Sequence, residues 1–389
     1  MHNKPWQDWV PGVLCDEQLK IMIEQGFIQC SGEINYDDIG YSSFDLHLSD
    51  EVYLMKEGAI KPNGGHYSQN YLNDFEIAEK QVADERGYYL LDKSNTYVVK
   101  LMERLAYINE IKKAELHGRA TAKSTIGRVD VLARLIIDGM YEYESFEPHL
   151  LENSNGEMFL EITPITFKVI IKPKISLSQL RLFLGKPEDS EIKSKILYKN
   201  SLRTPSELEK DDESLSVSLI PEIIKGKSTV AFRAKNTEKE IELWGREKYT
   251  AEEFWDLVEI QNINSIPDHK KRMVIQKEYF YILKSDEKIS LPPSIAVYCK
   301  AMDESLGEMR IHYAGFVHPY FGYQRDDRIS GTPLIFEVRG HDLLVNLLHR
   351  EKLAKLIFYR MSQTPVKKKE EDYEKQTLKL SKFFISFGN

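Results

Sequence analysis

The sequence predicts a mainly β protein of barrel or sandwich type with only a few short helices. Many short segments are rich in β-branched and aromatic residues, often alternate with polar ones, and end at Gly, Pro, Asn or Asp. The same order of segments occurs twice along the chain. With 389 residues, 42% of them hydrophobic, the chain can bury a large core and has room for two domains.

The first clear helix is expected in "DEQLKIMIEQG", residues 16–26, which has an acidic start, an apolar stripe and a glycine at its end. Strands dominate after it. They are expected at 43–55, 96–102, 157–162, 167–173, 278–284, 294–300 and 333–340. Many short strands with few helices are typical of barrels and sandwiches.

Two charged stretches divide the chain. Residues 185–214 carry Ser and Pro with little apolar periodicity, which predicts a connection between domains. A second charged run, 366–376, belongs to a predicted C-terminal tail. The predicted parts are a first domain, a linker, a second domain and a tail, at 12–184, 185–214, 215–363 and 364–389.

Composition excludes several function classes. The formal net charge is −8, so broad attraction to a nucleic-acid polymer or an anionic membrane is not expected, and any anion site must be local. The start "MHNKPWQDWVPG" lacks the features of a signal peptide, and the apolar runs are too short to span a bilayer. Cys15, Cys30 and Cys299 have no paired spacing, which favours a reducing compartment. We therefore expect a cytoplasmic protein.

An internal repeat connects the two halves. "NTYVVKL", "AKSTIGRVDV" and "GEMFLEITP" follow one another in the first half, and "EYFYILK", "MDESLGEMRI" and "GTPLIFEVRG" in the second. Aligned on Gly127 and Gly307, Glu161 corresponds to Glu337. In the same alignment three carboxylates replace cationic and hydroxyl side chains of the first half. Asp303 replaces Lys123, Glu304 replaces Ser124, and Glu308 replaces Arg128. The pattern indicates one duplicated domain whose copies have diverged chemically.

The first-half loop has the composition of an anion site. Residues 117–138 place Arg119, Lys123, Arg128 and Arg134 among Gly, Ser and Thr. Hydroxyls, backbone N–H groups and cations offer charge-assisted hydrogen bonds to a nucleoside triphosphate. The acidic second copy would repel the same ligand. The alternative interpretation is that Lys123 and Arg128 merely solvate a loop.

Glu161 and Glu337 each place a charge within an apolar strand. Burial raises the pKa of a carboxyl toward the range in which it can take a proton from water and return it to a leaving amine. A solvent-facing glutamate on a half-exposed strand is the alternative for either residue. Arg128 could hold the glutamate or the water in place, or form only a surface ion pair.

These segments carry a resemblance. "AKSTIGRVDV" resembles the phosphate-binding G-R-S-S-x-A-R motif of the dCTP deaminases, which share a β-rich fold with the trimeric dUTPases. "SSFDLHL" is similar to the family's A-x-x-D-L strand, and "AGFVHPYFG", 314–322, to its pyrimidine-pocket hairpin. "FLEI" and "IFEV" resemble the strand with the catalytic glutamate, and "YEKQ", 373–376, the Y-x-x-Q tail. The chain most resembles the long tandem members of this family.

The resemblance implies two tandem dUTPase-like β-barrel domains that deaminate dCTP hydrolytically to dUTP and ammonia. It implies the catalytic candidates Glu337, Glu161 and Arg128. It implies a set of substrate-binding residues, namely Lys123, Ser124, Thr125, Ala314, Phe316, Val317, His318, Tyr373 and Gln376. Mg²⁺ is expected with the triphosphate. No zinc is expected, because the H-x-E and P-C-x-x-C signature of zinc deaminases is absent. A homo-oligomer is expected.

Some positions depart from the family pattern. Lys123 stands for the first arginine of the phosphate motif, and His318 for the hairpin aspartate. The first-half hairpin carries an insertion that leaves the role of Asp138 open. At most one phosphate site per chain is therefore expected.

Two pairings of the halves remain open. The first-half loop can face the second-half hairpin and Glu337, or two first halves can meet across an oligomer with Glu161 as the acid/base. A dUTPase or bifunctional enzyme, and a non-catalytic nucleotide sensor, are the alternative functions.

Overall fold

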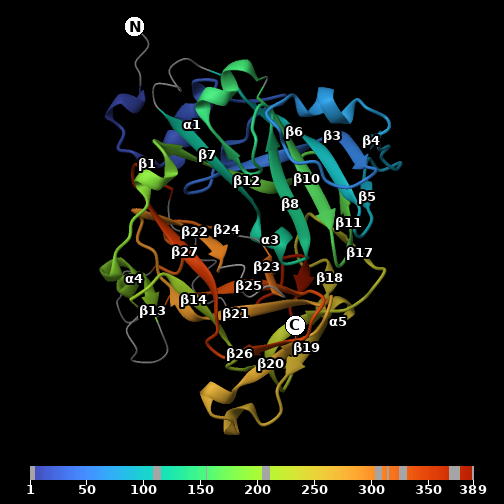
Figure 1. Cartoon of the computed structure of the whole chain (residues 1–389), viewed down its shortest axis with the longest axis vertical. Coiled ribbons are helices and arrows are strands. Elements are labelled where there is room, and N and C mark those ends of the chain that lie inside the picture. The colour runs from blue at the N-terminus through green and yellow to red at the C-terminus, as the bar shows by residue number, and fades with distance from the viewer. Residues whose placement is uncertain are drawn as a thin grey trace.

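The computed structural model describes residues 5–107, 115–154, 156–203, 211–302, 309–312, 315–323, 331–367 and 377–387. Two β-rich bodies lie one above the other along the long axis (Figure 1), the first half of the chain at one end and most of the second half at the other. The prediction of a mainly β fold built from two barrel-like domains is confirmed. No helix in the described ranges is long and apolar enough to cross a membrane.

The first domain is built on one curved antiparallel sheet. Its strand order is β8-β10-β6-β3-β12-β7-β9, with β1, β2 and β4 added at its sides. The bounds of these strands are β1 Gly12–Val13, β2 Ile28–Cys30, β3 Phe44–Met55, β4 Ala78–Lys80, β6 Thr96–Leu105, β7 Leu116–Ala122, β8 Val131–Ile137, β9 Ser145–Phe146, β10 Glu157–Pro164 and β12 Ser176–Leu184.

Helix α1 (Asp16–Glu24) forms where the sequence predicts it. Its acidic first turn suits the positive end of the helix dipole. Leu19, Met22 and Ile23 recur at helical spacing and are buried against the sheet. Gly26 follows the helix with φ of +76°, a conformation that glycine adopts without strain.

The second domain repeats this arrangement. Its strands run in the order β23-β25-β21-β14-β27-β22-β24, so that each has a counterpart in the first domain, and β13, β15, β16 and β19 extend the sheet. The bounds are β13 Leu202–Arg203, β14 Ser214–Ser218, β15 Glu222–Ile224, β16 Lys227–Ala234, β19 Trp255–Glu259, β21 Phe280–Ile289, β22 Ile295–Ala301, β23 Met309–His312, β24 Gly315–Val317, β25 Thr332–Gly340 and β27 Lys352–Arg360.

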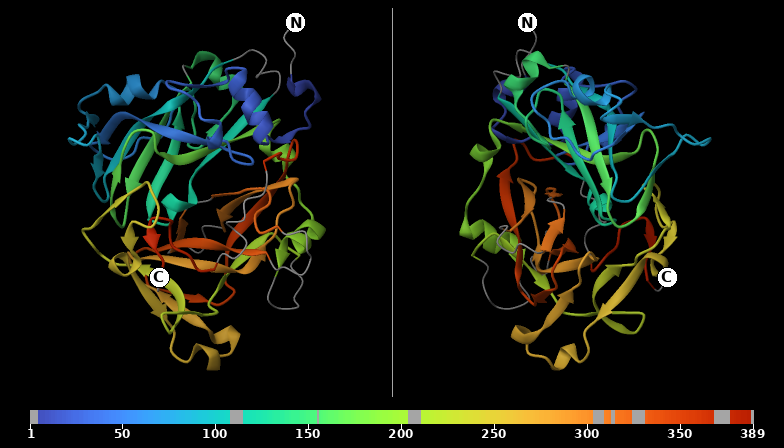
Figure 2. Two further views of the ribbon diagram at one scale, coloured as in Figure 1. Left: turned by 180° about the vertical axis from the view of Figure 1, so that it is seen from behind. Right: turned by 45° about the vertical axis from the view of Figure 1, so that its right-hand side comes forward.

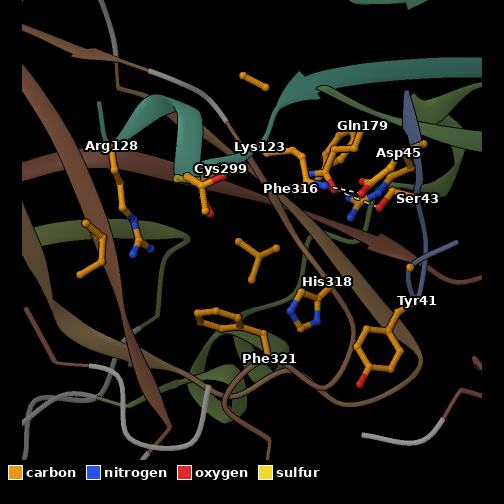
Figure 3. Close-up of a pocket in the computed structure, with 18 of the residues that line it drawn as sticks. Tyr41, Ser43, Asp45, Lys123, Arg128, Gln179, Cys299, Phe316, His318 and Phe321 are labelled. Carbon is orange, nitrogen blue, oxygen red and sulfur yellow. Dashed lines mark hydrogen bonds and ion pairs between the residues drawn. The ribbon is translucent and has the colours of Figure 1, made fainter. Parts of the chain in front are cut away.

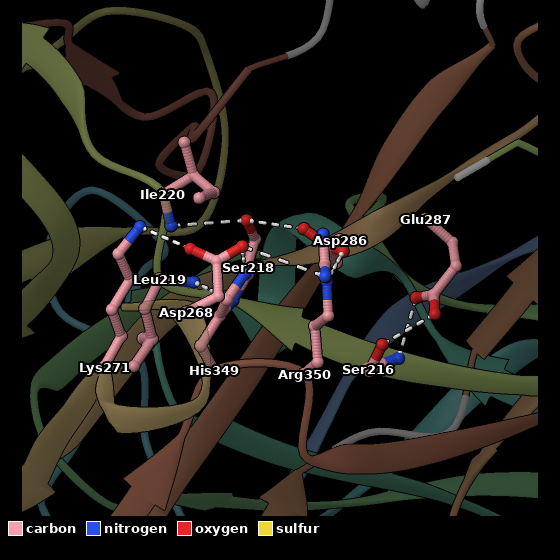
Figure 4. A network of polar contacts seen from close by, with 10 residues as sticks. All are labelled: Ser216, Ser218, Leu219, Ile220, Asp268, Lys271, Asp286, Glu287, His349 and Arg350. Atoms are coloured by element: carbon pink, nitrogen blue, oxygen red, sulfur yellow. Dashed lines mark hydrogen bonds and ion pairs between the residues drawn. The ribbon is translucent and has the colours of Figure 1, made fainter. Parts of the chain in front are cut away.

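A shared carboxylate contact supports the duplication. In the first domain Glu103 on β6 accepts a hydrogen bond from the backbone N–H of His47 at 2.8 Å, and its other oxygen lies 2.8 Å from His47 Nδ1. In the second domain Glu287 on β21 accepts from the N–H of Ser216 at 2.8 Å and from its hydroxyl at 2.6 Å (Figure 4). Both glutamates hold the neighbouring strand at the same place, as expected for two copies of one domain.

Smaller sheets and short helices complete the fold, and one of these sheets joins the two halves. The second-half strand β17 (Glu240–Glu242) runs parallel to β11 (Lys168–Ile171), which pairs with β5 (Tyr89–Leu91). The C-terminal strand β28 (Phe384–Ile385) pairs with β18 (Tyr249–Thr250), and β20 (Arg272–Ile275) with β26 (Val345–Leu348). The short helices are α3 Ser124–Gly127, α4 Lys195–Ser201 and α5 Ala251–Phe254.

The described part of the predicted linker, residues 185–203 and 211–214, contains short regular elements, including β13 (Leu202–Arg203). A 3-10 helix (Pro187–Ser190) and α4 lie within the predicted linker. The prediction of separate domain boundaries stays a prediction. The two further views in Figure 2 show α3 at the junction of the barrels, facing the orange and red strands of the second half. The α3 loop therefore lies where the two domains meet.

Candidate active site

A cavity of 410 Å³ lies between the two domains and is lined by both (Figure 3). The first domain contributes residues of the strand-β3 region, the α3 loop and β12, among them Tyr41, Ser43, Asp45, Lys123, Ser124, Thr125, Arg128, Gln179 and Arg181. The second domain contributes residues of β22, of β24 and the turn that follows it, and of β25, among them Cys299, Phe316, Val317, His318, Phe321 and Glu337.

The α3 loop brings two cations to the cavity. β7 ends at Ala122, and Lys123 caps the short helix in an extended conformation, its N–H bonded to the carbonyl of Leu177 at 2.9 Å. Ile126 is buried in the first-domain core and anchors the turn. Lys123 forms an ion pair with Asp45 on β3, and the Arg128 side chain is only 12% exposed. The loop therefore holds its cations in place before any ligand binds.

Glu337 faces Arg128 across the domain junction. It lies in the middle of β25, between Phe336 and Val338, and is 6% exposed. Its Oε1 atom lies 3.8 Å from Arg128 Nε. Burial raises the pKa of Glu337 to about 8, and the charge of Arg128 only partly offsets this shift. A carboxyl with such a pKa can both take up and release a proton near neutral pH.

The second-half hairpin forms an aromatic wall of the cavity. His318 stacks on Tyr41 with 5.1 Å between ring centroids, and its Nδ1 lies 2.7 Å from the carbonyl of Pro319. Burial lowers the pKa of His318 to about 4, and the nearby Arg181 adds to this effect. The imidazole is therefore neutral at pH 7. Phe316 and Phe321 complete a surface on which a flat ring can rest.

Arg181 was not anticipated from the sequence. It lies on β12, has no exposed surface, and donates hydrogen bonds to the Val297 carbonyl at 3.0 Å and to Ser42 Oγ at 3.1 Å. Its guanidinium lies 3.9 Å from the centre of the Phe316 ring. Burial lowers the pKa of Arg181 to about 9. An arginine inside the apolar strand "SLSQLRLFL" was the available signal.

Three further cations line the cavity from distant parts of the chain, namely Arg246, Lys367 and Lys382. Burial together with the charges of Lys123 and Arg246 lowers the pKa of Lys382. The segment around it rests on the loop, since Ser381 Oγ donates to the Thr125 carbonyl at 2.8 Å. The resemblance implied that Tyr373 and Gln376 of the tail bind substrate. No signal in the sequence indicated that Arg246, Lys367 and Lys382 line the cavity.

Arg119, Arg134 and Glu161 do not line the cavity. Arg119 contacts the Tyr359 hydroxyl at 2.9 Å, and Arg134 binds Glu161. Glu161 has no exposed surface, accepts from Arg134 Nε at 2.9 Å and from Tyr143 at 2.8 Å, and does not line the cavity. Ala314, Tyr373, Gln376 and the acidic loop with Asp303, Glu304 and Glu308 lie outside the described residues.

Asp138, whose role the sequence left open, accepts a hydrogen bond from the backbone N–H of Tyr67 at 2.8 Å and lies beside His66. It is a buried structural carboxylate of the first domain. Within the described ranges no three His, Cys, Asp or Glu side chains gather as metal ligands would. Asp37 and Asp38 line the mouth of the cavity together with the cations.

Comparisons with known proteins identify the family of this chain. Residues 10–186 match the family model of the 2′-deoxycytidine 5′-triphosphate deaminase (DCD) N-terminal domain, and residues 189–384 match that of the C-terminal domain. This chain belongs to the dCTP deaminase family and is an enzyme of that class.

One solved structure resembles the chain over almost its whole length. It is the crystal structure of 2′-deoxycytidine 5′-triphosphate deaminase from Agrobacterium tumefaciens, with a TM-score of 0.76 and 24% sequence identity. The match covers 91% of this chain and 99% of the other, and shows a shared fold. A comparison with curated protein sequences gives no match.

Proposed function

We propose that the enzyme deaminates dCTP hydrolytically in the cavity between its two domains, with Glu337 as the single proton shuttle. One observation carries the proposal. Glu337 is buried, has a pKa near 8, and lies 3.8 Å from an arginine of the loop that resembles a phosphate-binding motif. Membership of the dCTP deaminase family supports dCTP as the substrate.

The proposed reaction needs only one carboxylate. Ionised Glu337 takes a proton from a water molecule as the water oxygen bonds to C4 of the pyrimidine, and passes this proton to N3. The hydroxyl on C4 then loses its proton to Glu337, which delivers it to the amino group. The C4–N bond breaks, ammonia leaves, and C4 becomes the carbonyl of dUTP. Arg128 orients the carboxylate during both transfers.

The cations around the α3 loop suit the triphosphate. Lys123 and Arg128 lie on the loop, and Arg246 and Lys382 approach it from the second half. Each can form a charge-assisted hydrogen bond to a phosphate oxygen. Mg²⁺ would enter with the triphosphate as part of the substrate, coordinated largely by phosphate oxygens and water. Asp37 and Asp38 at the cavity mouth could accept hydrogen bonds from that water.

The aromatic wall suits the base. Phe316, Phe321 and Tyr41 offer apolar and stacking surface, and the neutral His318 adds no charge there. Because Phe316, Phe321 and Glu337 line the same cavity, a pyrimidine on this wall can direct C4 to the Glu337 carboxylate. Apolar walls also keep the dielectric low around Glu337, which maintains its raised pKa.

The test is to incubate the enzyme separately with dCTP and with dUTP and to resolve the products. We expect dUTP and ammonia from dCTP, and no reaction of dUTP. Release of dUMP and pyrophosphate from dUTP would instead assign a dUTPase or a bifunctional enzyme. Saturable dCTP binding without turnover would favour the nucleotide-sensing alternative.

Three further expectations stay predictions. The enzyme is expected to be independent of zinc, to form a homo-oligomer, and to work in the cytoplasm. Free Cys15, Cys30 and Cys299 support a reducing compartment, because none of them forms a disulfide in the structure.

A further inference from the structure

An ion pair between the two domains lies directly beside the proposed site. Asp130 follows the α3 loop, two residues beyond Arg128, and Arg339 lies on β25, two residues beyond Glu337. Arg339 Nη1 lies 2.6 Å from Asp130 Oδ2. Asp130 has no exposed surface, and the Arg339 side chain is 17% exposed. The pair thus joins the same two segments that carry the facing residues of the site.

Further hydrogen bonds hold Asp130 and Arg339 in place. Thr166 donates its hydroxyl proton to Asp130 Oδ2 at 2.5 Å and accepts from Arg339 Nη1 at 2.9 Å. The Asp130 N–H is bonded to the carbonyl of Gly127 at 2.9 Å, and its own carbonyl accepts from Ile165 at 3.0 Å. On β25, residues two apart project to the same side of the sheet. The contact between Arg339 and Asp130 therefore fixes one face of β25 against the α3 loop. Glu337 lies on that same face.

The fold itself does not require this pair. Glu161 and Glu337 occupy the same place in the two copies, so the counterpart of Arg339 in the first domain is Thr163. Thr163 Oγ1 lies 3.0 Å from Thr96 Oγ1, a neutral contact within one domain. Removing two charges from water is costly, and apolar side chains of similar volume often stabilise a protein as well as a buried ion pair does. A buried pair present in one copy only, beside the site, indicates a role in positioning.

We propose that Asp130 and Arg339 are positioning residues for deamination, which set the separation between Arg128 and Glu337. This inference rests on the proposed function, in which Glu337 shuttles the proton. Without the pair the α3 loop is free to shift against β25, and Arg128 moves away from the carboxylate. The Glu337 carboxylate then loses its orientation, and it also loses the nearby positive charge that partly offsets its raised pKa.

Because few charged groups surround Glu337 in the described structure, a displacement of Arg128 can be measured as a change in the pKa of Glu337. Among the residues whose side chains the structure describes, the titratable or charged groups that act on Glu337 are Arg128 from the loop and Cys299 from β22. Burial raises the pKa of Cys299 to about 12, so the thiol stays neutral. The strand neighbours of Glu337 are Ile282 on β21 and His312 on β23. Displacing Arg128 should therefore raise the pKa of Glu337.

The experiment compares Arg339→Met with Arg119→Met. Arg119 also joins the domains, through the Tyr359 hydroxyl at 2.9 Å, but does not line the cavity. For Arg339→Met we expect kcat to fall at least about tenfold while the dCTP Kd changes less than about threefold, because Arg128 loses its alignment with Glu337 while Lys123, Arg246 and Lys382 still meet the phosphates. The pH profile of kcat/KM should move to higher pH. Arg119→Met should keep the wild-type kinetics and profile.

Asp130→Asn provides a second route, because the amide keeps the size of the side chain and can still accept from Thr166. It should reproduce the change seen in Arg339→Met, and the double variant should be no worse than either single one, as expected for two partners in one contact. Unchanged kcat and pH profile in Arg339→Met and Asp130→Asn would overturn the inference, and so would an equal loss in Arg119→Met. Full activity in Glu337→Gln would instead overturn the proposed function.

Discussion

At the scale of single residues, Glu161 and Glu337 occupy equivalent strand positions but have different surroundings. Both lie on the same strand of their domain, flanked by apolar residues. Glu161 is held by Arg134 and Tyr143 inside the first domain. Glu337 faces the cavity, where Arg128 approaches to 3.8 Å. Of these two glutamates, only Glu337 lines the cavity.

The raised pKa of Glu337 predicts the pH dependence of catalysis. The residue must be ionised to take a proton from water, and its pKa in the free enzyme is about 8. Below this value the ionised fraction falls as the pH falls, so kcat/KM should rise about tenfold per pH unit toward pH 8 and level off above it. Steady-state assays from pH 5.5 to 9.5 check this. A profile that falls with pH across the range would contradict a general base at this position.

The loop cations predict the cost of losing a phosphate contact. Lys123→Ala and Arg128→Ala should each lower kcat/KM for dCTP by at least ~1.5 kcal/mol, about tenfold, because each removes a charge-assisted contact. Ammonia release over a dCTP series measures this. Lys61→Ala is a suitable control, since Lys61 forms an exposed ion pair with Glu142. Wild-type kinetics in both loop variants would remove the loop from the site.

At the scale of elements, the C-terminal segment closes one side of the site. β28 pairs with β18, Phe383 and Phe384 are buried in the core, and the Leu380 carbonyl accepts from Arg128 at 3.4 Å. Lys382 lies between these anchors and lines the cavity, whereas Lys379 in the same segment does not. The segment therefore presents one lysine to the ligand from a fixed backbone.

This arrangement predicts unequal effects of two neighbouring lysines. Lys382→Gln should weaken the binding of dCTP at least about fivefold and leave that of deoxycytidine unchanged, because only the triphosphate meets the lost charge. Lys379→Gln should bind both ligands as the wild type does. Calorimetric titration of each variant with both ligands measures the difference. Equal affinity for dCTP in the two variants would place Lys382 outside the phosphate site.

The elements also show what the sequence could and could not predict. An apolar stripe at helical spacing was sufficient to predict α1, and alternation with turn residues was sufficient for strands such as β3, β10 and β25. Local patterning determines these elements. Lys123 and Arg128 could be assigned to one loop since they are close in sequence. Arg181, Arg246 and Lys382 could not be grouped, because only the packing of distant segments brings them together. "FLEI" and "IFEV" are nearly identical locally, so the sequence could not separate their glutamates.

At the scale of the whole molecule, duplication has produced one asymmetric site between two similar domains. The first copy supplies Lys123 and Arg128, and the second supplies the aromatic wall and Glu337. Aspartate and glutamate replace the loop cations in the second copy, so we expect no phosphate site in the reciprocal pairing. Both halves of the cavity come from a single chain.

A site within one chain predicts the result of combining inactive variants. Arg128→Ala and Glu337→Gln chains, co-expressed with different tags and purified through both, should show no recovered deaminase activity, because every chain carries one defect in its own site. Separately purified parents give the baseline. Clear recovery in the doubly tagged sample would mean that the site forms between chains.

The most direct test of the account is to compare Glu337→Gln with Glu161→Gln. Removing the proton shuttle should lower turnover on the order of 10²-fold or more, with modest loss of dCTP binding. The pKa of Glu337 is raised from 4.5 to about 8, so its ionised form opposes folding above pH 4.5, and Glu337→Gln should melt no lower than the wild type at pH 8.

Glu161→Gln weakens the contact with Arg134 and should lower the melting temperature while keeping most of the turnover. Measured turnover of dCTP, with binding and melting as checks of folding, decides between them. The account predicts an inactive, folded Glu337→Gln beside an active Glu161→Gln. A fully active Glu337→Gln, or loss of turnover confined to Glu161→Gln, would contradict it.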